Sequence, residues 1–224
     1  MSSVCIIGSN RGIGLALTVE YIQHDWTVYA VCRTPSTALQ SLASKHQSLH
    51  IIQNIDVTKA SDIKELCAQL PTEVTEVIHN AGILRGDTVE SADDSEILEQ
   101  FTVNALAPLN TLRALKSHLT DLQKVGIVTS RMGSIGDCTS AGMLGYRISK
   151  TAVNMVGKNL ANAWASNRFT MLLLHPGYVR TDMTGGNGLI NPDESARGLF
   201  TLMRSKGPKD SGTFWHTNGE PLPW

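Results

Sequence analysis

Short runs of apolar residues alternate along the chain with longer segments in which apolar residues recur every three or four positions. The first run, 4–7, leads through a glycine-rich stretch into such a segment at 13–22. Runs of the first kind are typical of buried strands, and segments of the second kind are typical of amphipathic helices. The pattern therefore predicts a strand that leads directly into a helix at the start of the chain.

The same alternation continues along the rest of the sequence. Further strands are predicted at 27–32, 50–53, 74–79, 125–129, 170–174 and 213–216, and helices at 36–45, 60–70, 93–119, 146–165 and 192–204. Strands that alternate with helices favour parallel βαβ units, and strands with unbroken apolar content are buried on both faces. We therefore expect an α/β fold, with one doubly wound parallel sheet of the Rossmann type and helices on both faces.

Composition limits the classes of function that remain. With 224 residues, of which 42% are hydrophobic and 17% charged, the chain can form one well-packed domain over 1–224 and is too apolar for a disordered protein. A net charge of −1 gives no overall field for nucleic acid or an anionic membrane surface. Without a secretory pattern or a membrane-spanning apolar run, a cytoplasmic protein is expected. The scattered cysteines fit reduced thiols and predict no metal site.

Three glycines stand at the junction of the first strand and the first helix. Gly8, Gly12 and Gly14 form a GxxxGxG string. Glycine lets a backbone turn sharply and approach a pyrophosphate, while the amides at a helix N-terminus favour an anion. The spacing differs from the usual GxGxxG, and no Lys-Ser or Lys-Thr pair follows as in a P-loop. The position of the string nevertheless favours a phosphate-binding turn.

Tyr146 and Lys150 are four residues apart in a predicted helix, so their side chains emerge on one face. A free phenol has a pKa of about 10, and a nearby ammonium favours the phenolate, which makes the pair a tunable acid and base. Such pairs also occur on many surface helices without any function. Ser130 follows the strand predicted at 125–129, at the edge where sheets of this type hold ligands, and favours the catalytic interpretation.

Three motifs together resemble the classical short-chain dehydrogenases/reductases along essentially the whole chain. They are the glycine string at 8–14, HNAG at 79–82 and YRISK at 146–150. The segments TSRMGSIGD at 129–137, PGYVRTDM at 176–183 and NGEPLPW at 218–224 resemble the subgroup of Sniffer-like carbonyl reductases and the bacterial C-factor. The resemblance implies an oxidoreductase with a nicotinamide cofactor.

By this resemblance, four residues carry the chemistry. Tyr146 exchanges a proton with the substrate, Lys150 binds the nicotinamide ribose and lowers the pKa of Tyr146, and Ser130 holds the carbonyl oxygen. Asn104 supports a proton relay through water, although it could also be an ordinary polar residue in a helix. Ser134 competes with Ser130 for its role, because Ser130 precedes Tyr146 by 16 residues, a few more than is usual in the family.

The expected cofactor is NADP(H). The stretch VCRT at 31–34 contains no acid to bond a ribose 2′-hydroxyl, and Arg33, 19 residues after Gly14, can bind a 2′-phosphate. Arg11 could close on the same phosphate, and Asp56 meets the adenine unless it is only a helix cap. The full set of expected contacts is Gly8, Asn10, Arg11, Gly12, Ile13, Gly14, Arg33, Asp56, Val57, Asn80, Ala81, Gly82, Tyr146, Lys150, Pro176, Gly177, Val179 and Thr181.

The function expected from the sequence is NADPH-dependent reduction of an aldehyde, ketone or quinone. A nucleotide-binding signalling protein of the C-factor type is the alternative. The apolar faces of the helices at 93–119 and 146–165 exceed what one sheet face can cover, which predicts a homo-oligomer, a dimer or tetramer by the family resemblance. The tail at 219–224 ends in a tryptophan and is expected to be ordered instead of fraying, docked near the substrate cleft or at a subunit interface.

Overall fold

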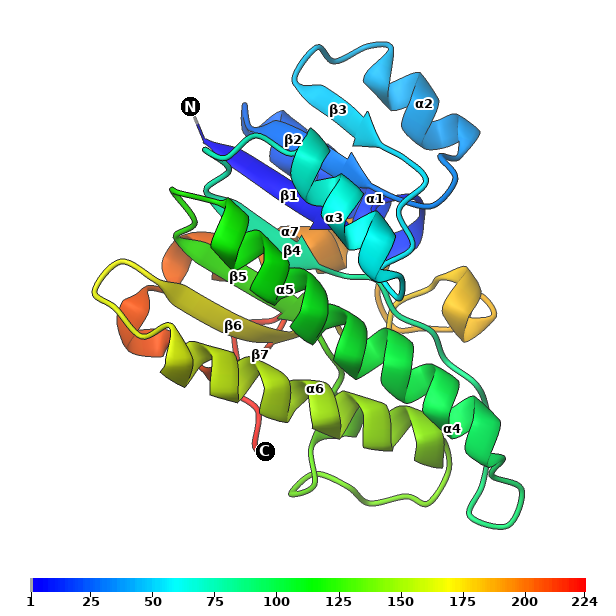
Figure 1. Ribbon diagram of the computed structural model, residues 1–224. Helices are drawn as coiled ribbons and strands as arrows, with labels where there is room; N and C mark the ends of the chain where they lie inside the picture. Colours follow the sequence, from blue (N-terminus) through cyan, green and yellow to red (C-terminus); the bar gives the residue numbers. More distant parts are fainter. Residues whose placement is uncertain (1) are drawn as a thin grey trace.

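The computed structural model describes residues 2–224 and contains a seven-stranded parallel sheet in the order β3-β2-β1-β4-β5-β6-β7 (Figure 1). The strands are β1 Ser3–Ile7, β2 Thr27–Val31, β3 Leu49–Ile52, β4 Glu76–His79, β5 Lys124–Val128, β6 Thr170–His175 and β7 Thr213–His216. The order reverses between β1 and β4, as in a doubly wound sheet. The predicted fold class is confirmed.

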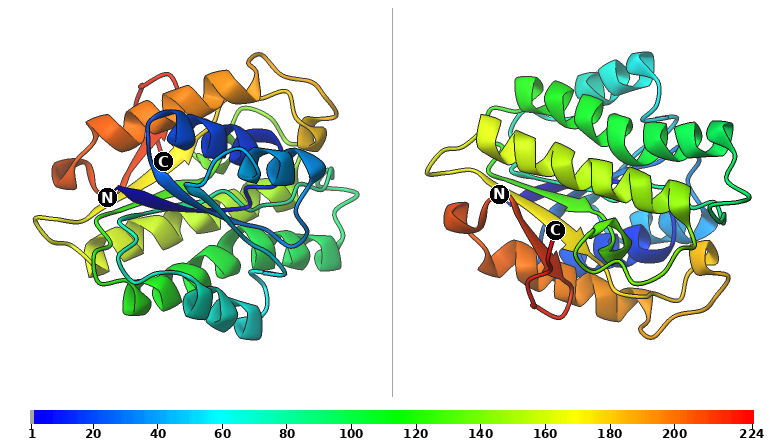
Figure 2. Two further views of the ribbon diagram at one scale, coloured as in Figure 1. Left: turned by 90° about the horizontal axis from the view of Figure 1, so that it is seen from above. Right: turned by 90° about the horizontal axis from the view of Figure 1, so that it is seen from below.

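Helices cover both faces of this sheet (Figure 2). The α-helices are α1 Gly12–Gln23, α2 Thr37–Ala43, α3 Ala60–Gln69, α4 Asp94–Phe101, α5 Ala107–His118, α6 Leu144–Ala163 and α7 Pro192–Ser205. One hydrophobic core joins the sheet to α3, α5 and α6, and the other joins it to α1, α2 and α7. In β1, Val4 and Ile6 face the second core and Cys5 and Ile7 the first, because neighbouring side chains of a strand point to opposite faces.

The prediction of a single α-helix at 93–119 is wrong in one respect. Its middle is a π-helical turn, η1 Thr102–Leu106, where the amide of Ala107 donates to the carbonyl of Thr102 five residues back. Pro108 is the physical cause, because it has no N–H for the carbonyl of Asn104 and its ring crowds that carbonyl. Every other predicted boundary lies within two residues of the observed one.

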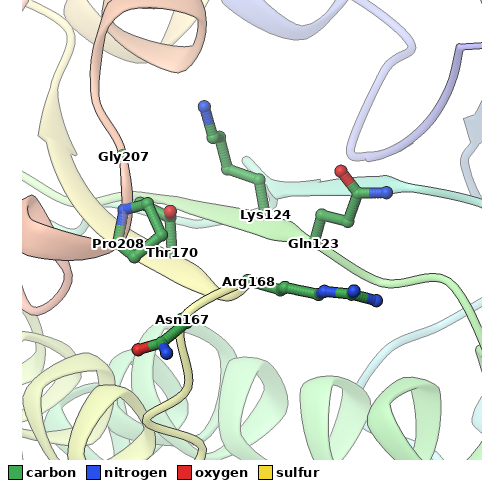
Figure 3. Close-up of a pocket in the computed structure, with 7 residues that line it drawn as sticks. All are labelled: Gln123, Lys124, Asn167, Arg168, Thr170, Gly207 and Pro208. Carbon is green, nitrogen blue, oxygen red and sulfur yellow. The ribbon is translucent and has the colours of Figure 1, made fainter.

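The loops at the carboxyl edge of the sheet carry the motifs found in the sequence. They follow β1, β4, β5 and β6 and converge where the strand order reverses. At the opposite edge, a cavity of about 460 Å³ is lined by Gln123, Lys124, Asn167, Arg168, Thr170, Gly207 and Pro208 (Figure 3). Among the helices described for residues 2–224, none has the length and apolar character needed to cross a membrane.

Candidate active site

The glycine turn after β1 needs all three of its glycines. Gly8 and Gly12 have φ angles of 84° and 53°, in the left-handed region that side chains disfavour. A Cβ on Gly8 would lie 2.8 Å from the Cα of Ala81, and a Cβ on Gly14 would collide with the carbonyl oxygen of Gly8. The turn is therefore as tight as a phosphate-binding turn must be.

The N-terminus of α1 opens directly from this turn. Its N-cap residue, Arg11, is extended, and the Arg11 guanidinium contacts the carboxylate of Asp182 at 2.8 Å instead of capping the helix. A Cβ on Gly12 would lie 3.2 Å from Cγ2 of Thr181, so the loop after β6 faces the turn closely. The positive end of the α1 dipole is thus directed into the space between the two loops and favours an anion there.

Asn80, from the loop after β4, fixes the glycine turn from a third side. Its side-chain amide donates to the carbonyl of Gly8 at 2.8 Å, and its backbone amide donates to the carbonyl of Ile7 at 2.9 Å. The structure therefore brings the first two sequence motifs together, as predicted for a single nucleotide site.

The residues expected at the adenosine end lie beside the glycine turn. Asn10 accepts a hydrogen bond from the backbone amide of Ser36, while the Ser36 hydroxyl donates to the carbonyl of Asn10 at 2.8 Å. Arg33 lies exposed just beyond β2. Asp56 accepts hydrogen bonds from the amide and hydroxyl of Thr58, and these bonds hold the pKa of its carboxyl below the usual value. Asp56 thus builds its own turn, and α3 begins later, after Lys59.

Ser130, Tyr146 and Lys150 meet at the ends of β5 and α6. The Ser130 hydroxyl lies near enough to the Tyr146 phenol to lower its pKa, and the Lys150 ammonium lies 5.6 Å from the centroid of the Tyr146 ring. Lys150 Nζ donates to the carbonyl of Val128 at 3.1 Å. The rival candidate, Ser134, is buried, and its hydroxyl accepts from the amide of Asp137. The geometry therefore favours Ser130 as the hydroxyl partner of Tyr146.

Burial dominates the electrostatics of the pair. It raises the pKa of Tyr146 to about 12, against which the nearby Ser130 hydroxyl acts, and it lowers the pKa of Lys150 to about 8. The lowering of the Tyr146 pKa expected from the nearby ammonium is not seen, because Lys150 faces the ring and the Val128 carbonyl instead of the phenol oxygen. Tyr146 is therefore protonated at neutral pH in this state and can act as a proton donor.

Asn104 projects from the π-helical turn into the same region. Its side-chain oxygen accepts from the amide of Ile83 at 2.8 Å, and its side-chain nitrogen donates to the carbonyl of Ile83 and to the hydroxyl of Ser149. A Cβ on Gly82 would lie 3.1 Å from the Asn104 side chain and 3.5 Å from Lys150 Nζ. Asn104 thus ties the loop after β4 to α6, one residue before Lys150.

A buried asparagine that the sequence did not single out joins the Ser130 turn to α6. Asn154 accepts from the hydroxyl of Thr129 at 2.7 Å and donates to the carbonyl of Gly133 at 3.1 Å. A Cβ on Gly133 would lie 2.6 Å from the carbonyl carbon of Lys150, so only glycine permits this contact. The turn that carries Ser130 is therefore held directly against the helix that carries Tyr146 and Lys150.

Asp87 was also missed, because no local pattern marks it. Its backbone carbonyl accepts from the amide of Met143 and its carboxylate from the amide of Gly145, both at 2.9 Å. The N-cap residue Met143 is in the left-handed conformation and contributes a backbone contact only. Asp87, 58 residues before Gly145, therefore supplies the side-chain cap of α6 just before Tyr146.

Comparisons with known proteins agree with this geometry. The family model described as short chain dehydrogenase matches residues 2–189, which contain the glycine turn, Ser130, Tyr146 and Lys150. A protein of Rhodococcus sp. (strain AD45), named 1-hydroxy-2-glutathionyl-2-methyl-3-butene dehydrogenase, is 36% identical over 231 residues, which cover 100% of both chains.

Two solved structures are similar over the whole chain. Carbonyl reductase Sniffer of D. melanogaster has a TM-score of 0.93 and 27% sequence identity, with 100% of both chains covered. The NADPH-bound carbonyl reductase from chicken fatty liver has a TM-score of 0.92 and 30% identity, with 100% of this chain and 99% of that chain covered.

The buried ammonium leads to a prediction about stability. Because the pKa of Lys150 is about 8 in the folded chain and 10.5 is its ordinary value, the charged form is disfavoured by folding. We expect Lys150→Met to raise the free energy of unfolding at pH 7 by about 3.5 kcal/mol, because a difference of one in pKa corresponds to about 1.4 kcal/mol. The gain should fade as pH rises from about 8 to about 10.5, because the folded parent then loses this proton while the unfolded chain still holds it, which stabilises the parent.

Urea unfolding at a series of pH values measures this difference. Lys158→Met serves as the control, because it removes a lysine from the same helix whose ammonium contacts the carbonyl of Gly212. A Lys150→Met variant that is less stable than the parent at pH 7, or whose gain is the same at pH 7 and pH 10.5, would contradict the prediction.

Proposed function

The chain belongs to the short-chain dehydrogenase family, and we propose that it is an NADPH-dependent oxidoreductase that reduces an aldehyde, ketone or quinone. The observation that carries the proposal is the convergence of Ser130, Tyr146 and Lys150, with the Ser130 hydroxyl near enough to the phenol to lower its pKa and Lys150 against the Tyr146 ring. It places a protonated phenol and a second hydroxyl together at the same sheet edge as the glycine turn. A carbonyl oxygen between the two hydroxyls would be both held and protonated.

The residues at the glycine turn fit a dinucleotide. The glycines give the backbone its tight path, the α1 amides face the space between the loops after β1 and β6, and Thr181 lies against Gly12. When bound, the cofactor would supply a hydride to the carbonyl carbon, and it would leave oxidised as NADP⁺. The NADPH-bound chicken reductase has the same fold over the whole chain.

The protein residues divide the remaining work. Ser130 would hold the substrate oxygen, and Tyr146 would give its proton to that oxygen as negative charge develops, which leaves an alcohol and a phenolate. Lys150 would bind the nicotinamide ribose and stabilise the phenolate. We propose that the Asn104 carbonyl, which Pro108 cannot bond, receives the water of a proton relay that restores the phenol.

A substrate panel tests the function. NADPH oxidation should be followed with aldehydes, ketones and quinones, and NADP⁺ reduction with alcohols that include a glutathione conjugate, because the Rhodococcus relative is named for such a substrate. Turnover of any member supports the enzyme. NADPH binding without turnover across the panel would favour the alternative, a nucleotide-binding signalling protein.

Tyr146→Phe should abolish turnover while folding and NADPH affinity stay close to those of the parent. The change removes one oxygen and leaves the ring packing against Lys150. A proton-transfer residue contributes about 10²- to 10⁴-fold, so kcat should fall by at least about a hundredfold. The measurement is kcat with an active panel substrate, together with NADPH binding by fluorescence. Tyr178→Phe, an exposed tyrosine beyond β6, is the matched control. Near-normal kcat in Tyr146→Phe would refute the assignment.

We propose that Arg33 selects NADPH over NADH. Arg33 lies exposed just beyond β2, so its guanidinium is available to a 2′-phosphate. Its positive charge also helps to lower the pKa of Asp56. Arg11 contacts Asp182 in this state and would have to leave it to reach the same phosphate. One charge-assisted bond contributes about 1.5–3 kcal/mol, which favours NADPH by at least about tenfold.

Arg33→Ala should therefore lower kcat/KM for NADPH by at least about tenfold and change kcat/KM for NADH by less than about twofold. The two values are measured with one substrate in the parent, in Arg33→Ala and in Arg168→Ala, which removes an arginine at the opposite sheet edge. Equal efficiency of the parent with both coenzymes, or an unchanged ratio in Arg33→Ala, would show that another residue selects the coenzyme.

We also propose a homodimer or tetramer built on the outer faces of α4 and α6. These helices pack side by side (Figure 1), and Leu98 on α4 and Met155 on α6 are 63% and 62% exposed, with Leu106 and Ile148 also exposed. Isolated apolar side chains on a surface are ordinary, whereas several on adjoining helices favour an interface.

The double variant Leu98→Glu, Met155→Glu should be a monomer, because it would place charges in the interface. Light scattering over a wide concentration range should give the mass of two or four chains for the parent and of one chain for the variant. Leu189→Glu, at a 78% exposed position outside these helices, should keep the parent mass. A monomeric parent would disprove the interface.

A further inference from the structure

The last residues of the sequence return along the edge of the sheet. The amide of His216 donates to the carbonyl of Glu220, and the amide of Leu222 donates to the carbonyl of Phe214, both at 2.8 Å. Trp215 and Pro221 form an antiparallel bridge. The segment therefore covers the outer edge of β7, and the predicted order of the tail is confirmed.

Trp224 is fixed at the end of this return. Its indole is stacked on the ring of Phe214, with centroids 5.8 Å apart and an angle of 22° between the planes. Phe214 is buried at 2% exposure, so one face of Trp224 rests on the core although the residue is 47% exposed. The stacking sets the position of the Trp224 backbone.

That backbone holds the loop at 131–143, which joins Ser130 to α6. The amide of Gly136 donates to the carbonyl of Trp224 at 2.7 Å. A Cβ on Gly136 would lie 3.1 Å from the same oxygen and 3.6 Å from Cβ of Pro223, so the loop backbone approaches the tail closely. Next to this contact, Arg131 and Asp137 form an ion pair that closes the loop on itself.

The far half of the loop is held from α6. The Arg147 guanidinium donates to the carbonyl of Gly142 at 2.9 Å and to the hydroxyl of Ser140 at 2.7 Å. Gly136 lies between this anchor and the turn that Asn154 holds at Gly133. The contact with Trp224 therefore supports the backbone in the middle of the loop, where the Arg147 guanidinium reaches only the Cys138 thiol.

We propose that Trp224 is a positioning residue for the loop between Ser130 and Tyr146. Its indole stacks on Phe214, and its main-chain oxygen accepts the hydrogen bond from the Gly136 amide, so that the loop is fixed. The position of this loop then determines how well the site accepts its substrate. The structural part stands on the contacts above. The effect on substrate acceptance rests on the proposed function.

Hydrogen exchange tests the structural part without any turnover. Peptides that cover 131–143 should exchange at least about fivefold faster when Trp224 is deleted, because the Gly136 amide loses its acceptor, and also faster in Trp224→Ala, which keeps the carbonyl but loses the stacking. Trp224→Phe keeps both and should stay within about twofold of the parent. Leu189→Ala, which removes an exposed apolar side chain elsewhere, should leave this loop unchanged.

Kinetics test the second part. With an active substrate, Trp224→Ala should raise KM by at least about threefold, with kcat and NADPH affinity close to those of the parent, and Trp224→Phe should restore KM. Unchanged exchange in 131–143 after deletion of Trp224, or a rise spread evenly over all peptides, would overturn the proposal. So would an unchanged KM in Trp224→Ala. A parent without turnover would contradict the proposed function, while the exchange experiment would still decide the structural part.

Discussion

The side-chain amide of Asn154 holds the end of β5 against α6, and the arrangement of the site depends on this contact. Thr129 and Gly133, which flank Ser130 closely in sequence, are both bonded to that one amide. All three groups are buried, so losing either bond would leave a polar group unpaired at a cost of about 1–3 kcal/mol. The approach of Ser130 to Tyr146 then follows from the packing of two rigid elements and needs no flexible segment to bring it about.

The same burial that makes this contact strong also determines the charges of the site. Lys150 is held as a buried ammonium by the carbonyl of Val128, and the low polarity that lowers its pKa to about 8 raises that of Tyr146 to about 12. Keeping the Lys150 ammonium buried lowers the stability of the folded chain, as is common where a functional site needs a charge in an apolar environment. A phenol that stays protonated supports the proposed reductive direction, in which Tyr146 gives a proton away.

Most of the fold and half of the site could be predicted from the sequence, because their signals are local. Apolar periodicity predicted every strand and the segments that form α-helices, and the glycine string and the Tyr146 and Lys150 pair each lie within a few residues of one another. The π-helical turn was missed because the apolar pattern continues through Pro108. Contacts such as Asp87 with Gly145 join distant residues and depend on the path of loops, which no periodicity encodes.

The loop between Ser130 and Tyr146 shows what those distant contacts achieve. A connection of this length would ordinarily be mobile, since exposed loops make few buried contacts. Here its backbone is bonded at Gly133 by Asn154, at Gly136 by Trp224, at Gly142 by Arg147 and at Met143 by Asp87, which come from three separate parts of the chain: α6, the loop after β4 and the tail. Three of these four anchor points are glycines, where a backbone can approach its partner without a side chain between them. The loop is thus ordered before any substrate arrives, so little conformational entropy remains to be lost when one binds.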